Sequence, residues 1–255
     1  MRARSEPQTE DGAAGGAAPG ADLGHVEAFI FDLDNTLYPA ECDLFRQIDA
    51  RMAEFIRGRL GVDEAEARRL QKSYYVRYGT TLAGLMREHG VKPEEFLGYV
   101  HDVDLSVVPE DADLAARIRA LPGRKFVFTN GSVAHAERVM ARVGILDSFD
   151  AIFDIAAAEF LPKPHAETYR RFAEACAVDA PRAAMFDDIA VNLEAAHALG
   201  MTTVLVSSAA AWIADEPAGR RPARPGDRHA YVHHVTDDLA AFLARAKTAA
   251  RKGPP

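Results

Sequence analysis

The sequence contains little cysteine and no long apolar run. Its two cysteines, Cys42 and Cys176, are too few for a disulfide framework and favour a reducing compartment. No apolar stretch reaches the roughly 18 residues that a membrane-spanning helix needs. The N-terminus lacks the apolar segment of a secretory signal. We therefore expect a cytoplasmic protein with no membrane partner.

Basic charge is also scarce relative to acidic charge. The chain has 30 lysines and arginines against 38 aspartates and glutamates, so its net charge is -8 at pH 7. This balance argues against non-specific binding to nucleic acid or anionic membranes. Hydrophobic residues nevertheless make up 48% of the 255 residues. That fraction is enough for one substantial domain and a smaller one.

Large apolar side chains are rare at both ends of the sequence. Residues 1–24 are rich in glycine, alanine and acids, and residues 249–255 end in Lys-Gly-Pro-Pro. Such segments bury too little apolar surface to offset the entropy lost on folding. We predict disordered tails over both ranges.

Five short apolar runs have the continuous pattern of strands that are buried on both faces. They are Ala28–Phe31, Lys125–Thr129, Ala151–Ile155, Ala183–Phe186 and Thr202–Val206. Helical patterns separate the last four, at Val133–Val143, Ala166–Ala177 and Asn192–Leu199. This alternation predicts an α/β fold with a doubly wound, mostly parallel sheet. A last edge strand is expected over Tyr231–Val235.

Residues 39–108 interrupt the alternation. They contain no strand-like run and carry apolar residues such as Leu44 and Ile48 at helical spacing. An insertion directly after the first strand would lie over the strand tips and could act as a lid. We therefore predict an α/β core formed by residues 25–38 and 109–248, with residues 39–108 as a helical cap.

The most informative segment is Phe-Asp-Leu-Asp-Asn-Thr-Leu, which follows the first strand and contains Asp32 and Asp34. Because side chains alternate along a strand, both carboxylates point to the same side if the strand geometry continues. Two carboxylates at such short range repel each other unless a cation or a shared proton reduces the repulsion. The pair therefore indicates a magnesium site with a nucleophile and a proton-transfer group. A helix-capping turn is the alternative; a calcium loop fails because Leu37 stands where that loop needs glycine.

Three further polar motifs follow the later strands. They are Thr129-Asn-Gly-Ser132, Lys163-Pro164 and Asp187-Asp188. Each motif alone could be an ordinary turn, a solvated lysine or a helix cap. In open α/β sheets, however, ligands bind outside the carboxyl ends of the strands. The whole set on successive strands therefore predicts one site.

Together the four motifs resemble those of the haloacid dehalogenase-like superfamily of phosphohydrolases, over about residues 26–210. The resemblance implies a Rossmann-like core, and the helical insertion is similar to the first (C1) cap type of that superfamily. It also implies a Mg²⁺-dependent phosphatase that acts on a small-molecule phosphate ester. We expect a monomer or homodimer with no nucleic-acid partner.

The same resemblance assigns roles to the motif residues. Asp32 would be the nucleophile that forms an aspartyl-phosphate, and Asp34 would protonate the leaving alcohol and then deprotonate water. Lys163 would neutralise charge between nucleophile and phosphate. The residues that bind the phosphoryl group would be Thr129, Asn130, Gly131 and Lys163. The magnesium ligands would be Asp32, the backbone carbonyl of Asp34, Asp188 and Asp187, the last either directly, through water or as a partner of the lysine.

Asp34 also discriminates within the superfamily. Haloacid dehalogenases resemble this chain but lack an acid two residues after the nucleophile, which an alcohol leaving group needs. A phosphatase is therefore favoured over a 2-haloacid dehalogenase. A non-enzymatic binder that keeps the fold is disfavoured because all the motif residues are present.

The segment Tyr74–Leu85 bears on the substrate. With three tyrosines near a Gly-Thr-Thr interruption, and with the Asp-Asn-Thr-Leu-Tyr-Pro and Thr-Asn-Gly strings, it resembles the pyrimidine 5'-nucleotidase branch (subfamily IA). This branch implies hydrolysis of nucleoside monophosphates such as UMP and CMP. Tyr74 and Tyr78 could stack on a base and Arg77 could meet phosphate or ribose, whereas packing and solvation are the alternatives. Other enzyme candidates are sugar-phosphate or phosphoglycolate phosphatases and phosphoglucomutases of the same superfamily.

Two polar residues lie outside these motifs. Asn192 could brace the loop of the last motif or be an ordinary amide on a helix surface. Arg220 belongs to a loop rich in proline and glycine and is expected to be solvated.

Overall fold

The computed structural model describes residues 20–249. The predicted tails therefore lie outside the described residues, except for their inner ends. Strand β1 (Asp22–Leu23) pairs in parallel with β8 (Lys247–Thr248), and Leu23 is fully buried in the core. The fold thus begins before residue 25, because a single leucine in an otherwise polar segment reaches the core.

Six parallel strands form the central sheet in the order β4-β3-β2-β5-β6-β7. Their bounds are Ala28–Phe31 (β2), Arg124–Phe128 (β3), Ala151–Phe153 (β4), Ala183–Asp187 (β5), Thr202–Val206 (β6) and His234–Thr236 (β7). Strand β2 pairs with β3 on one side and with β5 on the other. The chain therefore winds outward in both directions from β2, as predicted for a doubly wound sheet.

Strand β4 is shorter than the apolar run at residues 151–155 indicated. The next residue, Asp154, is outside the strand. Its carboxylate accepts hydrogen bonds from the backbone nitrogens of Val133, at 3.0 Å, and Ala157, at 2.8 Å. The Asp154 side chain thus links the end of β4 to the start of α6 (Val133–Val143), the helix that follows the neighbouring strand β3. This local hydrogen bonding competes with continued pairing, which is why the strand stops at Phe153.

Strand β7 is displaced towards the C-terminus relative to the predicted range. The Thr203 hydroxyl donates to the carbonyl of Tyr231 at 2.7 Å and accepts from the backbone nitrogen of His233 at 3.1 Å. The Tyr231 carbonyl is thus bonded to a side chain, and the His233 nitrogen is shared between this hydroxyl and the Thr203 carbonyl, 3.2 Å away. Regular pairing therefore starts only at His234.

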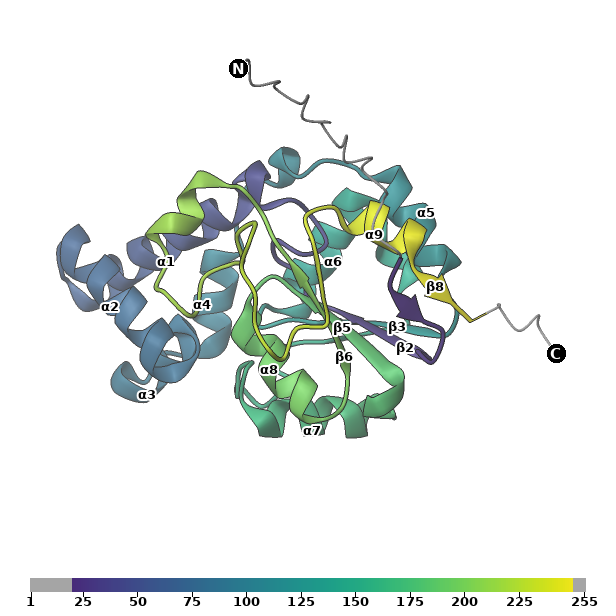
Figure 1. Cartoon of the computed structure of the whole chain (residues 1–255). Helices are drawn as coiled ribbons and strands as arrows, with labels where there is room; N and C mark the ends of the chain where they lie inside the picture. Colours follow the sequence, from purple (N-terminus) through teal and green to yellow (C-terminus); the bar gives the residue numbers. More distant parts are fainter. Residues whose placement is uncertain (1–19, 250–255) are drawn as a thin grey trace, which may run out of the picture.

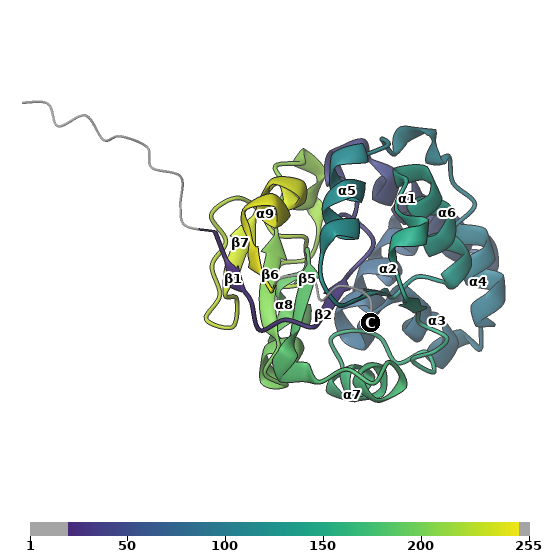
Figure 2. The same ribbon diagram turned by 90° about the vertical axis from the view of Figure 1, so that its right-hand side faces the viewer.

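Alternate strand residues face two layers of helices. Phe29 and Phe31 pack in one hydrophobic cluster with α5, α6 and α9, whereas Ile30 and Met185 pack in the other with α7 and α8. The helices span Ala112–Ala120 (α5), Val133–Val143 (α6), Ala166–Ala175 (α7), Ala190–Ala198 (α8) and Leu239–Arg245 (α9). Figure 1 shows α5, α6 and α9 above the sheet and α7 below it, and Figure 2 agrees. The α/β fold is the predicted one.

Four α-helices, here called the cap helices, occupy residues 44–100, in the segment between β2 and α5. They are α1 (Leu44–Leu60), α2 (Glu64–Tyr78), α3 (Thr81–His89) and α4 (Pro93–Val100), and they lie beside the sheet at the left of Figure 1. They share a hydrophobic cluster of their own around Ile56, Leu85 and Phe96. A separate core of this kind is what lets an insertion fold as a unit.

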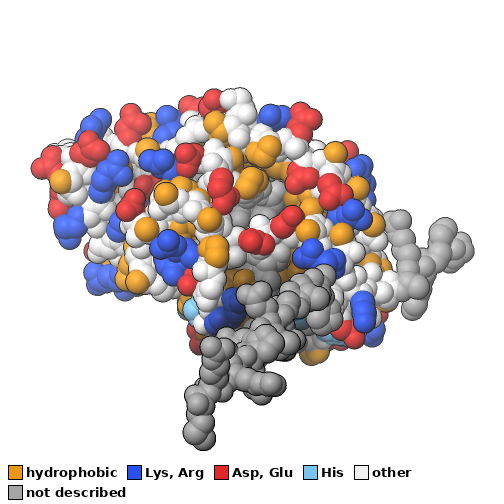
Figure 3. Space-filling model, turned by 45° about the horizontal axis from the view of Figure 1, so that its top comes forward, with side chains coloured by type: hydrophobic (Ala, Val, Ile, Leu, Met, Phe, Trp, Pro, Cys, Tyr) orange, Lys and Arg blue, Asp and Glu red, His pale blue; other side chains and the backbone are white. Residues whose placement is uncertain are grey.

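Charged side chains of both signs are interspersed over the face of the molecule in Figure 3. Many form exposed pairs one helical turn apart, such as Arg69 with Glu66 and Arg170 with Glu167. Water screens the charges of such exposed pairs, so each contributes little to stability and packing holds the fold. Among the described helices, none is both long and apolar enough to cross a membrane.

Candidate active site

The four sequence motifs meet where β2, β3 and β5 end. Asp32 directly follows β2, and its backbone nitrogen donates to the carbonyl of Phe186 at 2.8 Å. Asp187 is the last residue of β5, the neighbouring strand. Thr129 directly follows β3 on the other side and is buried. The parallel ladder thus brings three motifs to one edge of the sheet.

Lys163 lies between two of the aspartates. Its Nζ is 2.6 Å from Asp32 Oδ1 and 2.8 Å from Asp187 Oδ2, and the residue is only 2% exposed. Burial opposes its charge, but the two carboxylates hold the pKa of Lys163 above its usual range. The lysine is therefore a fixed cation at the centre of the site.

The Asn130 side chain holds the lysine in place. Its Oδ1 accepts from the backbone nitrogen of Lys163 at 2.9 Å, and its Nδ2 donates to the carbonyl of the same residue at 3.4 Å. Nearby, the Thr129 hydroxyl accepts from the backbone nitrogen of Gly131 at 2.9 Å. The Thr-Asn-Gly motif and the lysine motif therefore form one hydrogen-bonded unit.

The two acids after β5 have different surroundings. Asp187 Oδ1 accepts from the backbone nitrogen of Ile189 at 2.9 Å and from Asn192 Nδ2 at 2.8 Å, and its other oxygen binds Lys163. Asn192 thus braces this loop. In contrast, Asp188 Oδ2 is buried without a hydrogen-bond partner among the described residues. The oxygen of Asp188 is therefore available to a ligand.

The acidic cluster fits the magnesium ion that the resemblance implies. Asp32, Asp187 and Asp188 each offer a carboxylate oxygen, and these oxygens lie within 4.8 Å of one another. Burial, reinforced by neighbouring carboxylates, raises the pKa of Asp32 to about 7 and the pKa of Asp188 well above its ordinary value. A divalent cation would relieve this excess of negative charge, and oxygen ligands are those that Mg²⁺ prefers. The orphaned oxygen of Asp188 is the observation that favours such a ligand.

Asp34 has quite different neighbours. Its Oδ1 accepts from the Tyr38 hydroxyl at 2.7 Å and contacts His135 Nε2 at 3.1 Å. Although burial favours the neutral acid, His135 and Tyr38 hold the pKa of Asp34 below its ordinary value. The pKa values of Asp32 and Asp34 are therefore shifted in opposite directions: without metal the shifts favour a neutral Asp32 and an ionised Asp34, and a cation bound beside Asp32 would favour its ionised form.

A second histidine, His101, reaches the site from the cap. It follows α4 and stacks on His135 with ring centroids 4.2 Å apart and an interplanar angle of 11°. Burial lowers the pKa of His101 to about 3, so this ring is uncharged near neutral pH. Sequence reasoning missed both histidines. The one signal in the sequence was the position of His135, three residues after Ser132. This spacing puts it in the first turn of the helix that the Thr-Asn-Gly-Ser motif opens, close to the strand ends.

A cavity of about 140 Å³ joins this cluster to the cap helices. Its core side includes Asp32, Asp34, Thr129, Asn130, Gly131, Lys163 and Asp188. Its apolar wall comes from the cap and includes Phe45, Ile48, Met52, Leu82, Phe96, Leu97 and Val100. Arg220, which the sequence placed in a solvated loop, also lines it. The cap helices thus enclose the space into which the motif residues face.

The three cap residues predicted to set specificity do not line this cavity. Tyr74 is buried and its hydroxyl pairs with His89 Nε2 at 2.6 Å, whereas Arg77 is exposed and Tyr78 donates to Glu88. The structure therefore does not support their assignment to the substrate.

Tyr75 is the tyrosine of this segment that faces the cavity. It lines the cavity, and its hydroxyl donates to the carbonyl of Arg220 at 2.6 Å. Successive residues of a helix are about 100° apart around its axis, so a shift of one position selects another face of α2. The predicted segment thus reaches the cavity through Tyr75 and not through Tyr74, Arg77 or Tyr78.

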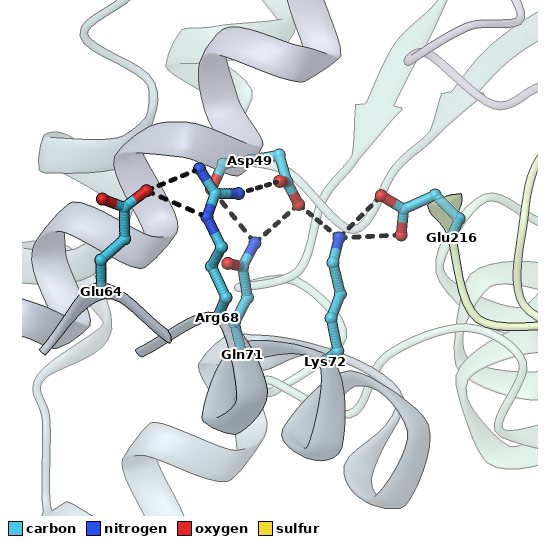
Figure 4. Close-up of polar contacts among 6 residues, drawn as sticks. All are labelled: Asp49, Glu64, Arg68, Gln71, Lys72 and Glu216. Carbon is cyan, nitrogen blue, oxygen red and sulfur yellow. Dashed lines mark hydrogen bonds and ion pairs between the residues drawn. The ribbon is translucent and has the colours of Figure 1, made fainter. Parts of the chain in front are cut away.

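An ion-pair network crosses from the cap to the core at the edge of the cavity. Lys72 Nζ lies 2.6 Å from Asp49 Oδ1 and 2.7 Å from Glu216 Oε1, as Figure 4 shows. Gln71 donates to the same oxygen, Asp49 Oδ1, at 2.6 Å, and Arg68 lies 3.9 Å from Asp49 Oδ2. Lys72, Asp49 and Glu216 all line the cavity, so a substrate there meets these charges as well as the motif residues.

Comparison with known proteins agrees with this geometry. Residues 26–200 match the haloacid dehalogenase-like hydrolase family model, and the chain belongs to that family. It is 29% identical over 197 residues to phosphate metabolism protein 8 of Saccharomyces cerevisiae, an alignment that covers 70% of this chain and 61% of the yeast protein. The chain thus spans less than two thirds of the length of that relative.

Solved structures of low sequence identity share the fold. An L-2-haloacid dehalogenase from Xanthobacter autotrophicus matches with a TM-score of 0.54 at 15% identity, over 86% of this chain and 97% of the other. A HAD phosphatase from Thermococcus onnurineus matches with a TM-score of 0.54 at 19% identity, over 82% and 93%. At such identities the likeness establishes the fold alone, and the choice between these chemistries depends on the site.

Proposed function

We propose that the protein is a Mg²⁺-dependent phosphomonoester hydrolase that acts through a phosphorylated Asp32. The observation that carries this proposal is the bridge of Lys163 between Asp32 and Asp187, with the open carboxylate oxygen of Asp188 in the same cluster. Phosphoryl transfer depends on positioning and on neutralised charge more than on covalent assistance. One lysine and one divalent cation around a carboxylate provide that environment.

The reaction follows from the placement of the two acids. Asp32 attacks phosphorus, the bond to the leaving oxygen breaks, and that oxygen keeps the electron pair and takes a proton from Asp34. Water then attacks phosphorus and gives a proton to Asp34, while the bond between phosphorus and Asp32 breaks to release phosphate. Asp34 ends protonated, ready for the next ester.

Other residues hold the phosphoryl group and the metal. Phosphoryl oxygens are bound by the Thr129 hydroxyl, the backbone amide of Asn130 and the ammonium of Lys163, and by the Gly131 amide once it releases the Thr129 hydroxyl. Asp32, the carbonyl of Asp34 and Asp188 would hold a magnesium ion, which would supply positive charge against the transferred group. Because both oxygens of Asp187 are engaged by Lys163, Ile189 and Asn192, we assign Asp187 the role of lysine partner.

We further propose nucleoside monophosphates such as UMP and CMP as the substrates. The resemblance of the motif strings to pyrimidine 5'-nucleotidases supports this class, and the rings of Phe45, Tyr75 and Phe96 in the cavity wall offer faces for a base. Stacking of a base on an aromatic ring contributes about 1–3 kcal/mol. The alternative is a sugar phosphate or phosphoglycolate, whose hydroxyl or carboxylate groups would meet Lys72, Glu216 and Arg220.

A panel of phosphate esters with Mg²⁺ tests both levels of the proposal. The wild type should hydrolyse p-nitrophenyl phosphate and Asp32→Asn should not; an inert wild type would contradict the phosphatase assignment. UMP should be turned over faster than sugar phosphates, and the reverse order would contradict the nucleotide assignment only. Release of halide from 2-haloacids would show that the interpretation of Asp34 is wrong.

A further inference from the structure

His135 makes a direct contact with the acid of the proposed reaction. The residue is 1% exposed and lies in the first turn of α6, where its Nε2 is 3.1 Å from Asp34 Oδ1. Its other ring nitrogen, Nδ1, is buried and has no partner among the described residues. The contact with Asp34 is therefore the polar interaction that this ring makes within the described part of the chain.

The direction of this hydrogen bond is determined by chemistry. Whether Asp34 is ionised or carries its proton on Oδ2, its Oδ1 is an acceptor, so the His135 imidazole donates to it from Nε2. The Tyr38 hydroxyl donates to the same oxygen, Asp34 Oδ1, at 2.7 Å. Two donors on Oδ1 fix the plane of the carboxyl group. They leave Oδ2 without a hydrogen-bond partner among residues 20–249, on a side chain that lines the cavity.

The plane of the His135 ring is held in turn by the cap. His101, which follows α4, stacks on the ring almost in parallel, with centroids 4.2 Å apart. The His101 ring contacts Ser132 Oγ at 3.1 Å, and its backbone carbonyl accepts from Arg138 at 3.0 Å. Contacts to α6 and its N-cap therefore fix a cap residue against the ring that touches Asp34.

We propose that His135 is a positioning residue that orients Asp34 so that Oδ2 faces the oxygen of the leaving alcohol. In this arrangement His101 links the placement of the cap helices to the orientation of the acid. The inference rests on the proposed phosphatase function and goes beyond it, because none of the four motifs includes His135 or His101.

The leaving group provides a readout that a merely structural role would not affect. An alkoxide departs poorly without a proton, whereas p-nitrophenolate is stable as an anion and needs little help from an acid. The value of kcat/KM reports the steps up to departure of the alcohol, and water attack on phospho-Asp32 is common to all esters. Loss of the orienting hydrogen bond should therefore lower kcat/KM selectively for alkyl phosphates.

The experiment compares wild type, His135→Met and His135→Gln with Mg²⁺ on UMP, glycerol phosphate and p-nitrophenyl phosphate. We expect His135→Met to lower kcat/KM about 10- to 100-fold for the better alkyl ester and less than about threefold for the aryl ester. The larger loss is a fraction of the rate enhancement that general acid catalysis provides. His135→Gln keeps an N–H donor near the Nε2 position and should recover part of the loss. The exposed His229, which is outside the cavity, gives the matched control His229→Gln, with no change on either ester.

Equal losses on both classes of ester would overturn the inference and leave the phosphatase assignment intact. The same holds if both His135 variants hydrolyse the alkyl ester at the wild-type rate. A wild type that hydrolyses no ester would instead overturn the proposed function, and the inference with it. Thermal unfolding of each variant identifies a misfolded protein, in which case His101→Leu, which removes the stacked ring from the cap side, must show the same selective loss.

Discussion

The ammonium of Lys72 in the cap contacts both carboxylate oxygens of Glu216 in the core, at 2.7 and 2.9 Å. The two residues are 144 positions apart in the sequence, and both side chains are mostly buried, with exposures of 29% and 10%. The pair closes the edge of the cavity between α2 and the segment after β6. It is therefore a direct link between cap placement and the site.

We expect Lys72→Met to weaken this link and to leave two partly buried carboxylates, Asp49 and Glu216, without their shared cation. Removal of one partner from a buried ion pair is costly because it strands the other charge. A double-mutant cycle with Glu216→Gln should give a coupling free energy of unfolding of about 1–2 kcal/mol. The single Lys72 variant should also raise KM more than it lowers kcat. A coupling energy near zero would show that the pair does not hold the cap.

Much of the site could be predicted because parallel strands bring their carboxyl ends to one edge. Asp32, Asp187 and Asp188 follow apolar runs that are recognisable without a structure, and the ladder then places them together. His101 and His135 could not be predicted in this way. Their contact depends on how a cap helix returns to α6, which is tertiary packing that no local pattern encodes.

The sequence could not tell which residues of α2 face the cavity, for a related physical reason. Tyr74 and Tyr78 are four residues apart and share one side of α2, whereas Tyr75 is about 100° from Tyr74 around the helix axis. Sequence alone does not say which side faces the core. In the structure Tyr74 packs against α3 and Tyr75 lines the cavity. The end of the N-terminal tail was misplaced because the burial of Leu23 depends on β8, more than 200 residues later in the chain.

Stability without metal should fall as the pH rises from about 4 to about 7. Burial raises the pKa of Asp32 from 3.8 to about 7, so the folded state keeps a proton in this window that the unfolded state has lost. When the folded state binds more protons than the unfolded one, the free energy of unfolding decreases with pH. Bound Mg²⁺ favours the ionised carboxylates, so the stabilisation by Mg²⁺ should grow over the same window.

Urea unfolding at about pH 5 and about pH 8, with EDTA or with Mg²⁺, measures the pH dependence of stability and the stabilisation by Mg²⁺. Asp32→Asn is the matched control, because it removes this carboxyl and should flatten the pH dependence of the metal-free protein. A metal-free wild type that becomes more stable towards pH 8, or a variant with the wild-type slope, would contradict the prediction.

The contact between α2 and α3 leaves no room for a side chain at Gly84. A Cβ atom there would lie 2.4 Å from the Cβ and Cγ atoms of Tyr74. Gly84→Ala should therefore destabilise the protein by about 1–3 kcal/mol through overpacking, although alanine is the better helix former. Gly58 in α1 is the matched control, since a Cβ there meets nothing within 4 Å. Gly58→Ala should stabilise by about 0.5–1 kcal/mol, and urea unfolding should show opposite signs for the two substitutions.

Substitutions on two faces of α2 separate cavity contacts from cap packing. Tyr75→Leu removes an aromatic ring from the cavity wall and the hydroxyl that donates to the Arg220 carbonyl, so KM for the best substrate should rise about tenfold if the ring contacts the leaving group at about 1–3 kcal/mol. Arg77→Ala changes an exposed side chain outside the cavity and should leave both kcat and KM within about twofold of wild type, since such surface changes are nearly neutral. Steady-state kinetics on the ester panel distinguish the two faces. A larger rise in KM for Arg77→Ala than for Tyr75→Leu would return the specificity role to the residues that the sequence first indicated.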